Sequence, residues 1–192
     1  YPLSMNDMAS STKARVRLAY DEFFAHQLTL GLARDKLRRS KGISTLGGGQ
    51  LRNIVVSQLP YALTEAQDRA VHEIIVDMSQ DHRMNRLLQG DVGSGKTLVA
   101  FLAFLNAVES GGQGVLMAPT EILARQHLES LRPLAMAAGV EIDILTGRDK
   151  GMERKAKLSR LFSGNIQILI GTHAVFQKDV AFCDLRLAIV DE

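Results

Sequence analysis

Two kinds of hydrophobic pattern alternate along residues 64–192. Stretches in which apolar residues recur every three or four positions predict helices, and the short continuous apolar runs between them predict strands covered on both faces. The predicted helices span about 65–78, 97–109, 120–138, 150–162 and 174–176, and the predicted strands span 114–118, 140–145, 166–170 and 185–190. This alternation is typical of an α/β fold in which a mainly parallel sheet lies between two layers of helices.

The first part of the chain shows another pattern. Apolar residues recur from Val16 to Leu32 with charges between them, which predicts one long amphipathic helix that begins near residue 11 or 12. Its apolar stripe needs a partner, either the domain that follows or one upstream. The glycine-rich stretch 42–49 predicts a flexible connection. We therefore expect a helical extension over residues 1–58 and an α/β domain over residues 59–192.

Composition predicts a soluble globular protein. Of the 192 residues, 46% are hydrophobic and 23% are charged, and no apolar run reaches the roughly 18 residues of a membrane span. A single cysteine can form no internal disulfide and no secretory signal opens the chain, so we expect a cytoplasmic protein without membrane contact. The net charge of +2 is uneven, because residues 1–52 hold nine Lys/Arg against four Asp/Glu.

The clearest functional pattern lies in residues 86–97. A short apolar run precedes Gly90-x4-Gly95-Lys96-Thr97 and a predicted helix follows, a placement between a strand and a helix. Glycines let backbone N–H groups wrap closely around phosphates with positive φ angles. Lys96 suits the β- and γ-phosphates, and Thr97 suits Mg²⁺ at the positive end of the helix. The sequence therefore predicts a nucleotide-binding P-loop made of Gly90, Gly93, Ser94, Gly95, Lys96 and Thr97.

Two adjacent carboxylates, Asp191 and Glu192, follow the last predicted strand. Alone, a strand that ends in acids is a weak signal, but together with a P-loop it is how a Walker B element looks. Asp191 would hold the Mg²⁺ shell, while Glu192 would polarise the water that attacks the γ-phosphate, with Lys96 as the other catalytic group. Because ligands bind parallel sheets at the carboxyl ends of the strands, we expect these groups at one edge.

Thr64-x-x-Gln67 has two interpretations. The pattern matches a capping box, in which Thr64 caps the helix and Gln67 returns to the N–H of Thr64. It also lies a short distance upstream of a P-loop, where superfamily 2 helicases carry a Gln that recognises the adenine edge. The two roles are compatible, and together with the other motifs the adenine role is favoured.

Four stretches of the chain resemble, in order, the motifs of the RecG family of superfamily 2 DNA translocases. They are Gln89–Thr97, Ala118–His127, Gly171–Phe176 and Ile189–Glu192. The resemblance is close over residues 60–192, and residues 13–35 resemble the helical segment that precedes the motor in that family. It implies a RecA-like P-loop NTPase lobe, the first of two motor lobes, in a piece cut from a longer enzyme.

The resemblance also implies a function. A RecG-like enzyme is an ATP-dependent translocase that remodels branched double-stranded DNA, such as stalled forks and Holliday junctions, in DNA repair and recombination. It would be a monomeric, nucleoid-associated motor with single-stranded DNA-binding protein as a further candidate partner. Because a second lobe supplies the arginine finger in this superfamily, we expect little or no ATP turnover from the isolated chain.

Two strand-end loops are implied to touch the DNA backbone. Hydroxyl and exposed N–H groups at helix starts can bind phosphate without reading sequence. The threonines of the two loops, Thr120 and Thr172, could also be ordinary N-caps. Arg125 could reach phosphate or pair with Glu121 or Glu129 on its own helix. The candidate DNA contacts are Pro119, Thr120, Gly171, Thr172 and His173.

Other functions fit parts of the pattern. The motor of the transcription-repair coupling translocase is similar, but Gly-Asp-Val-Gly-Ser-Gly and Ala-Pro-Thr-Glu fit RecG better. A P-loop kinase or GTPase is an alternative of another class, although the guanine-reading Asn-Lys-x-Asp is absent. A non-enzymatic ATP-sensing module is the third. The spacing of the histidines and the single cysteine predicts no zinc site.

Overall fold

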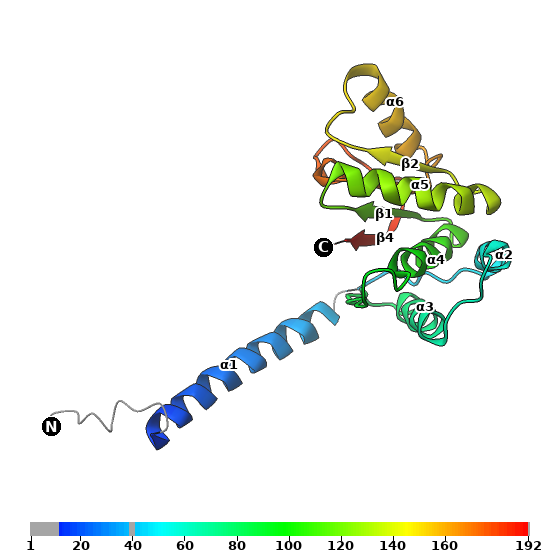
Figure 1. Ribbon diagram of the computed structural model, residues 1–192. Helices are drawn as coiled ribbons and strands as arrows, with labels where there is room; N and C mark the ends of the chain where they lie inside the picture. Colours follow the sequence, from blue (N-terminus) through cyan, green and yellow to red (C-terminus); the bar gives the residue numbers. More distant parts are fainter. Residues whose placement is uncertain (1–11, 39–40, 192) are drawn as a thin grey trace.

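A parallel four-stranded sheet forms the centre of the computed structural model, which describes residues 12–38 and 41–191 (Figure 1). The strand order is β2-β3-β1-β4, and every pairing is parallel. The strands are β1 (Gln113–Met117), β2 (Ile142–Leu145), β3 (Ile168–Gly171) and β4 (Leu185–Val190). The predicted α/β class and its parallel sheet are confirmed.

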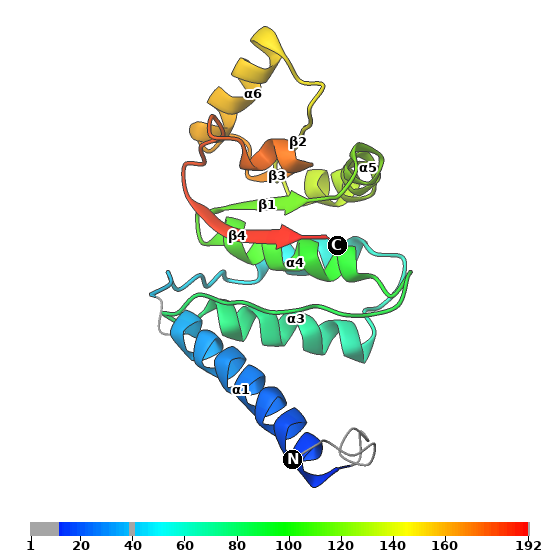
Figure 2. The same ribbon diagram turned by 90° about the vertical axis from the view of Figure 1, so that its left-hand side faces the viewer.

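Different helices cover the two faces of this sheet. Leu116 and Ile170 face a core shared with α4 and α5, while Val115 and Leu169, their neighbours in sequence, face a second core with α6 and the 3₁₀ helix η2. Figure 2 shows α4 against β1 and β4. The helices are α1 (Lys13–Arg38), α2 (Gln50–Gln58), α3 (Glu65–Met78), α4 (Lys96–Glu109), α5 (Glu121–Ala137), α6 (Gly151–Phe162) and η2 (His173–Phe176).

The helix that follows the P-loop, α4, is the most deeply buried of the helices. Every residue from Leu98 to Val108 is buried, because α4 lies between the sheet and a further layer formed by α2 and α3. A helix that is apolar on all sides is stable only in such a position. Burial of α4 fixes its N-terminus, and with it the P-loop, relative to the sheet.

The glycine-rich stretch predicted to be flexible is hydrogen-bonded to α4. Asn106 donates from Nδ2 to the carbonyl of Thr45 at 3.0 Å and accepts the Gly47 N–H at 3.0 Å. The Glu109 carboxylate accepts the N–H groups of Gly49, at 2.5 Å, and Leu51. Glu109 therefore caps α2, since the first N–H groups of a helix lack partners within it. The domain division at residue 58 stays a prediction.

The long helix predicted in the first part of the chain is confirmed as α1, which projects away from the sheet and its helices (Figures 1 and 2). Its large apolar side chains are exposed, including Phe23 at 65% and Leu32 at 63%. Within the described residues, α1 thus does not bury its apolar side chains on the α/β domain, which was one of the two partners predicted for it.

The strand expected before the P-loop is not formed. Residues 83–90 have no strand assignment, whereas β4, which lies across a cavity from them, is an edge strand of the described sheet. A strand requires a hydrogen-bonded neighbour. The apolar run is present, but no strand of the described residues is hydrogen-bonded to it.

Candidate functional site

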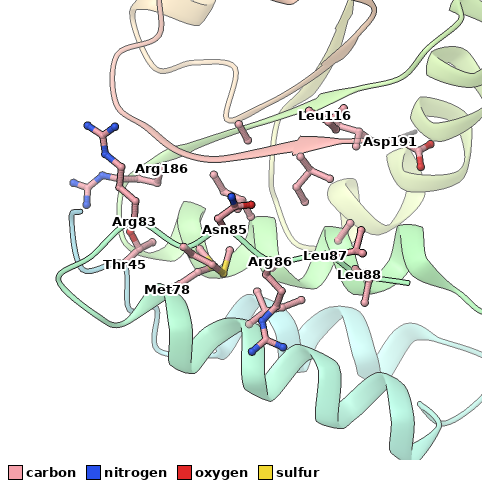
Figure 3. A pocket seen from close by; sticks show the side chains of 18 of the residues that line it. Thr45, Met78, Arg83, Asn85, Arg86, Leu87, Leu88, Leu116, Arg186 and Asp191 are labelled. Atoms are coloured by element: carbon pink, nitrogen blue, oxygen red, sulfur yellow. The ribbon is translucent and has the colours of Figure 1, made fainter. Parts of the chain in front are cut away.

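A cavity of about 1020 Å³ lies between β4 and the segment 83–90 (Figure 3). Its walls include apolar side chains such as Leu88, Leu116 and Leu187, with Arg86 and Arg186 from opposite sides. The polar groups predicted to bind nucleotide gather at one end, where Gly90, Lys96, Thr97 and Asp191 line the cavity. The structure therefore brings the P-loop and the first Walker B carboxylate together. Glu192 lies outside the described residues.

The P-loop has the backbone geometry that its glycines predict. Gly93 and Gly95 both have φ of 83°, in the left-handed region that glycine adopts without strain. Gly95 is the N-cap of α4 and no side chain caps this helix, so its first N–H groups are not taken up by a capping side chain. The Lys96 ammonium donates to the carbonyls of Gly90 at 2.7 Å and Asp91 at 3.0 Å. These carbonyls hold the lysine within its own loop.

Gln67 performs the capping role and a second one. Its Oε1 accepts the Thr64 N–H at 3.0 Å, and the Thr64 hydroxyl accepts the Gln67 N–H at 3.2 Å, so the capping box is confirmed. Its Nε2 donates to the carbonyl of Ser94 at 2.9 Å. Gln67 thus braces the P-loop against α3. Adenine recognition by Gln67 stays a prediction.

Arg86 fixes the segment that leads into the P-loop, a role that the sequence analysis missed. Its Nη1 lies 2.6 Å from Glu73 Oε2, and its Nε lies 2.8 Å from Asp77 Oδ2, both on α3. Hydrogen bonds to Asp77 and Glu73 raise the pKa of the Arg86 guanidinium above its usual value. The i, i+4 spacing of the two acids on one helix face was the available signal.

The strand ends place the remaining candidates side by side. Met117 pairs with Gly171 on one side and with Val190 on the other, and Asp191 continues the ladder by donating its N–H to the Met117 carbonyl at 2.8 Å. The residues that follow β3, β1 and β4 therefore lie in that order along one edge. These are Thr172, Ala118 and Asp191.

The candidate DNA contacts differ in exposure. Pro119, Thr120 and His173 are exposed, but Gly171 is buried, and a side chain there would collide with the Leu145 carbonyl. Packing alone therefore accounts for Gly171. Thr120 is an N-cap, because its hydroxyl accepts the N–H of Leu123 at 3.3 Å, whereas Thr172 makes no side-chain cap. The DNA-contact role of these residues stays a prediction.

The basic side chains near this edge pair with acids. Arg125 Nη2 lies 2.8 Å from Glu121 Oε1, and Arg148 Nε lies 3.1 Å from Glu121 Oε2. Of the two alternatives for Arg125, pairing with an acid on its own helix is therefore the one observed.

The loop after β2 holds a carboxylate with a shifted pKa. Burial raises the pKa of Asp149, but hydrogen bonds from Lys157 and Thr146 outweigh the effect of burial and lower the pKa below its usual value.

The oxygen groups at the polar end of the cavity suit Mg²⁺. A threonine hydroxyl and a carboxylate are hard oxygen ligands, and Mg²⁺ usually takes only one or two carboxylates and completes its shell with water and phosphate oxygens. No cluster of three or more His, Cys, Asp or Glu able to hold a metal occurs in the described part of the chain. Nor does any helix within residues 12–38 and 41–191 have the length and apolar character to span a membrane.

Comparison with known proteins places this geometry in context. Residues 64–192 match the DEAD/DEAH box helicase family. The chain is 48% identical over 180 residues to the ATP-dependent DNA helicase RecG of Bacillus subtilis, covering 93% of this chain and 26% of that protein. It is 42% identical over 191 residues to the RecG of Escherichia coli K12, covering 99% and 28%. The chain spans about a quarter of the length of these curated relatives.

A solved structure of RecG bound to a three-way DNA junction superposes with a TM-score of 0.83 at 44% identity. The match covers 94% of this chain and 25% of that one. The superposed region is thus nearly the whole chain and not a single motif. The family match and these relatives favour the helicase interpretation over the kinase or GTPase alternative.

Proposed function

The chain belongs to the DEAD/DEAH box helicase family, and from this premise we propose that it is the ATP-binding motor lobe of a translocase that remodels branched double-stranded DNA. Its substrates would be stalled forks and Holliday junctions in DNA repair and recombination. The observation that supports this most is that Lys96, Thr97 and Asp191 line one end of the same cavity. This end of the cavity therefore offers groups that can bind phosphate and Mg²⁺, and it lies at the same edge of the sheet as the loops proposed to contact DNA.

The ATP site would use these groups in distinct roles. Lys96 would exchange its bonds to the carbonyls of Gly90 and Asp91 for the β- and γ-phosphate oxygens. The N–H groups at the start of α4 would cradle the phosphates. Thr97 and Asp191 would hold Mg²⁺, and the chemistry that Mg²⁺ supplies when bound is neutralisation of phosphate charge. Glu192 would polarise the attacking water.

The base and the DNA would contact neighbouring parts of the same edge. Gln67, already hydrogen-bonded to the P-loop at the Ser94 carbonyl, would read adenine. Pro119, Thr120, Thr172 and His173, with the backbone of Gly171, would contact DNA phosphates and not bases. The proposal includes a monomeric, nucleoid-associated motor and leaves single-stranded DNA-binding protein as a candidate partner.

The test is DNA-stimulated ATP hydrolysis by the whole natural protein. A three-way junction should stimulate hydrolysis more than linear duplex or single-stranded DNA. Lys96→Ala should lower the stimulated rate by about 10²–10³-fold, as for removal of one group that stabilises transition-state charge. Lys155→Ala, which changes an exposed lysine on α6, is the matched control and should hydrolyse normally. Junction remodelling at the normal rate by Lys96→Ala would refute the motor proposal.

The isolated chain provides a second test. Without the arginine finger expected from a second lobe, its 192 residues should hydrolyse ATP at no more than about one-thousandth of the stimulated rate of the whole protein. A DNA-stimulated rate comparable to that of the whole protein would contradict the assignment of this chain as one half of the ATP site.

A further inference from the structure

One side chain from α5 contacts the proposed Mg²⁺ ligand directly. His127 Nε2 lies 2.7 Å from Asp191 Oδ2, and the two side chains are 15% and 34% exposed. The distance is that of a charge-assisted hydrogen bond. His127 is the last residue of the stretch Ala118–His127, one of the four that resemble RecG motifs, but the proposed function gives it no role. The contact joins the helix after β1 to the residue after β4, 64 positions later in the chain.

The chemistry of the two groups determines the direction of the bond. An ionised carboxylate can only accept, so the hydrogen lies on Nε2 of His127 and is donated to Oδ2 of Asp191. The bond engages one carboxylate oxygen and leaves Oδ1 for another ligand. It therefore fixes the rotation of the carboxylate, which the backbone of Asp191 alone does not determine.

The bond is not needed to hold either element in place. On α5, Ala124, Leu128 and Leu131 are buried in the core. On the other side, the Asp191 backbone is anchored by its N–H bond to the Met117 carbonyl. The hydrogen bond between His127 and Asp191 thus adds orientation at a position that packing and backbone pairing already fix.

We propose that His127 is a positioning residue that orients the Asp191 carboxylate for Mg²⁺ in the nucleotide complex. The inference rests on the proposed function, because it assumes that Asp191 is the Mg²⁺ ligand. A hydrogen-bond donor to a metal-binding carboxylate raises the affinity of the site by restricting the ligand to its binding orientation, and its loss typically costs about 10–100-fold in metal affinity.

Two isosteric substitutions separate this role from a general effect on folding. In His127→Gln, the amide nitrogen can reach the place of Nε2 and donate to Asp191. In His127→Asn, the amide nitrogen lies near the place of Nδ1 and falls short. Glu129→Ala, on the exposed part of the same helix, is the control.

The readout is binding of a fluorescent ADP analogue to the whole protein, titrated with Mg²⁺ and repeated in EDTA. For His127→Asn we expect the Mg²⁺ concentration at half-maximal enhancement of binding to rise about tenfold or more, with affinity in EDTA unchanged. His127→Gln should recover most of the difference, and Glu129→Ala should match the wild type. The same order should appear in the Mg²⁺ dependence of ATP hydrolysis.

Other outcomes would overturn the inference. If both His127 variants show the wild-type Mg²⁺ dependence, or if both lower thermal stability and weaken binding equally in Mg²⁺ and EDTA, His127 does not position the metal ligand. Failure of the proposed function is a different result, since the wild-type protein would then show no Mg²⁺-dependent nucleotide binding and no DNA-stimulated hydrolysis.

Discussion

The two walls of the cavity are held in different ways. β4 is paired with β1 from Gln113 opposite Leu185 to Met117 opposite Val190, with one register shift at Arg186. The facing segment, residues 83–90, forms no strand, and side-chain hydrogen bonds anchor it, chiefly those of Arg86 to α3. Each wall ends in a group proposed to bind the nucleotide. Backbone pairing therefore positions the carboxylate, whereas side chains and the buried helix α4 position the phosphate loop.

This difference predicts unequal sensitivity to substitution. A strand held by several backbone hydrogen bonds keeps its register when one side chain is changed. A segment held by a few side chains can shift when one of them is lost. Substitutions in the segment 83–90 should therefore perturb the ATP site more easily than substitutions in β4.

The largest expected effect distinguishes the chemical roles of Lys96 and Asp191, which belong to opposite walls of the cavity. Lys96→Ala and Asp191→Asn should each lower ATP hydrolysis by the whole protein about 10²–10³-fold. In EDTA, Lys96→Ala should still weaken binding of the ADP analogue about tenfold or more, because a charged hydrogen bond to phosphate is lost. Asp191→Asn should weaken binding only when Mg²⁺ is present.

Fluorescence titration with and without Mg²⁺ measures this split, and Lys155→Ala is the control. Asn at position 191 can still accept the hydrogen bond from His127, so the change removes charge while preserving shape. If Asp191→Asn loses as much ADP affinity in EDTA as Lys96→Ala does, Lys96 and Asp191 do not have separate roles.

Much of this arrangement could be predicted from the sequence. The apolar runs at β1 to β4 and the periodic helices α3 to α6 differ from their predicted bounds by only one or two residues, because each is encoded by its local pattern. The P-loop and Asp191 were predicted on the same grounds. Their convergence followed from the rule that strand ends share one edge.

What the sequence analysis missed depends on distant partners. α2 is capped by Glu109, about 60 residues further along the chain, and thus lies in a stretch that locally resembles a flexible linker. His127 meets Asp191 only because β1 and β4 are neighbours. Conversely, the P-loop was expected to follow a strand, but pairing is a property of two segments, and the local apolar run describes only one.

A matched pair of arginines tests the contrast between the walls with a smaller expected effect. Arg86→Met keeps the apolar stem but breaks the bonds to Glu73 and Asp77, so the segment and the P-loop should loosen. We expect about fivefold weaker ADP binding and a stability loss of about 1 kcal/mol, since these ion pairs are partly exposed. Calorimetry and fluorescence titration provide both values.

Arg186→Met is the control on the opposite wall. Arg186 also lines the cavity and bonds to Asp184 at 2.7 Å. It lies at the register shift of β4, between Leu185 and Leu187, which both pair with β1, so the same chemical change is made in a strand held by its backbone on either side. Its ADP affinity should stay within twofold of the wild type. Equal losses of affinity in the two variants would contradict the idea that only the segment 83–90 depends on side chains.

The smallest expected effect concerns the brace between α3 and the P-loop. In Gln67→Glu, the carboxylate can still accept the Thr64 N–H but cannot donate to the Ser94 carbonyl, so the cap survives while the brace is lost. ATP affinity should fall about threefold, within the value of one ordinary hydrogen bond, and the preference for ATP over GTP should narrow. Stability should stay close to that of the wild type.

Gln67→Ala removes both bonds, so it should show the same loss of ATP affinity and, in addition, a stability loss of about 1 kcal/mol from the broken capping box. Competition binding with ATP and GTP, together with thermal unfolding of each variant, distinguishes the two functions of the side chain. If both variants keep full ATP affinity and only Gln67→Ala loses stability, Gln67 is a cap and nothing more. The loop would then be positioned by α4 and Arg86 without it.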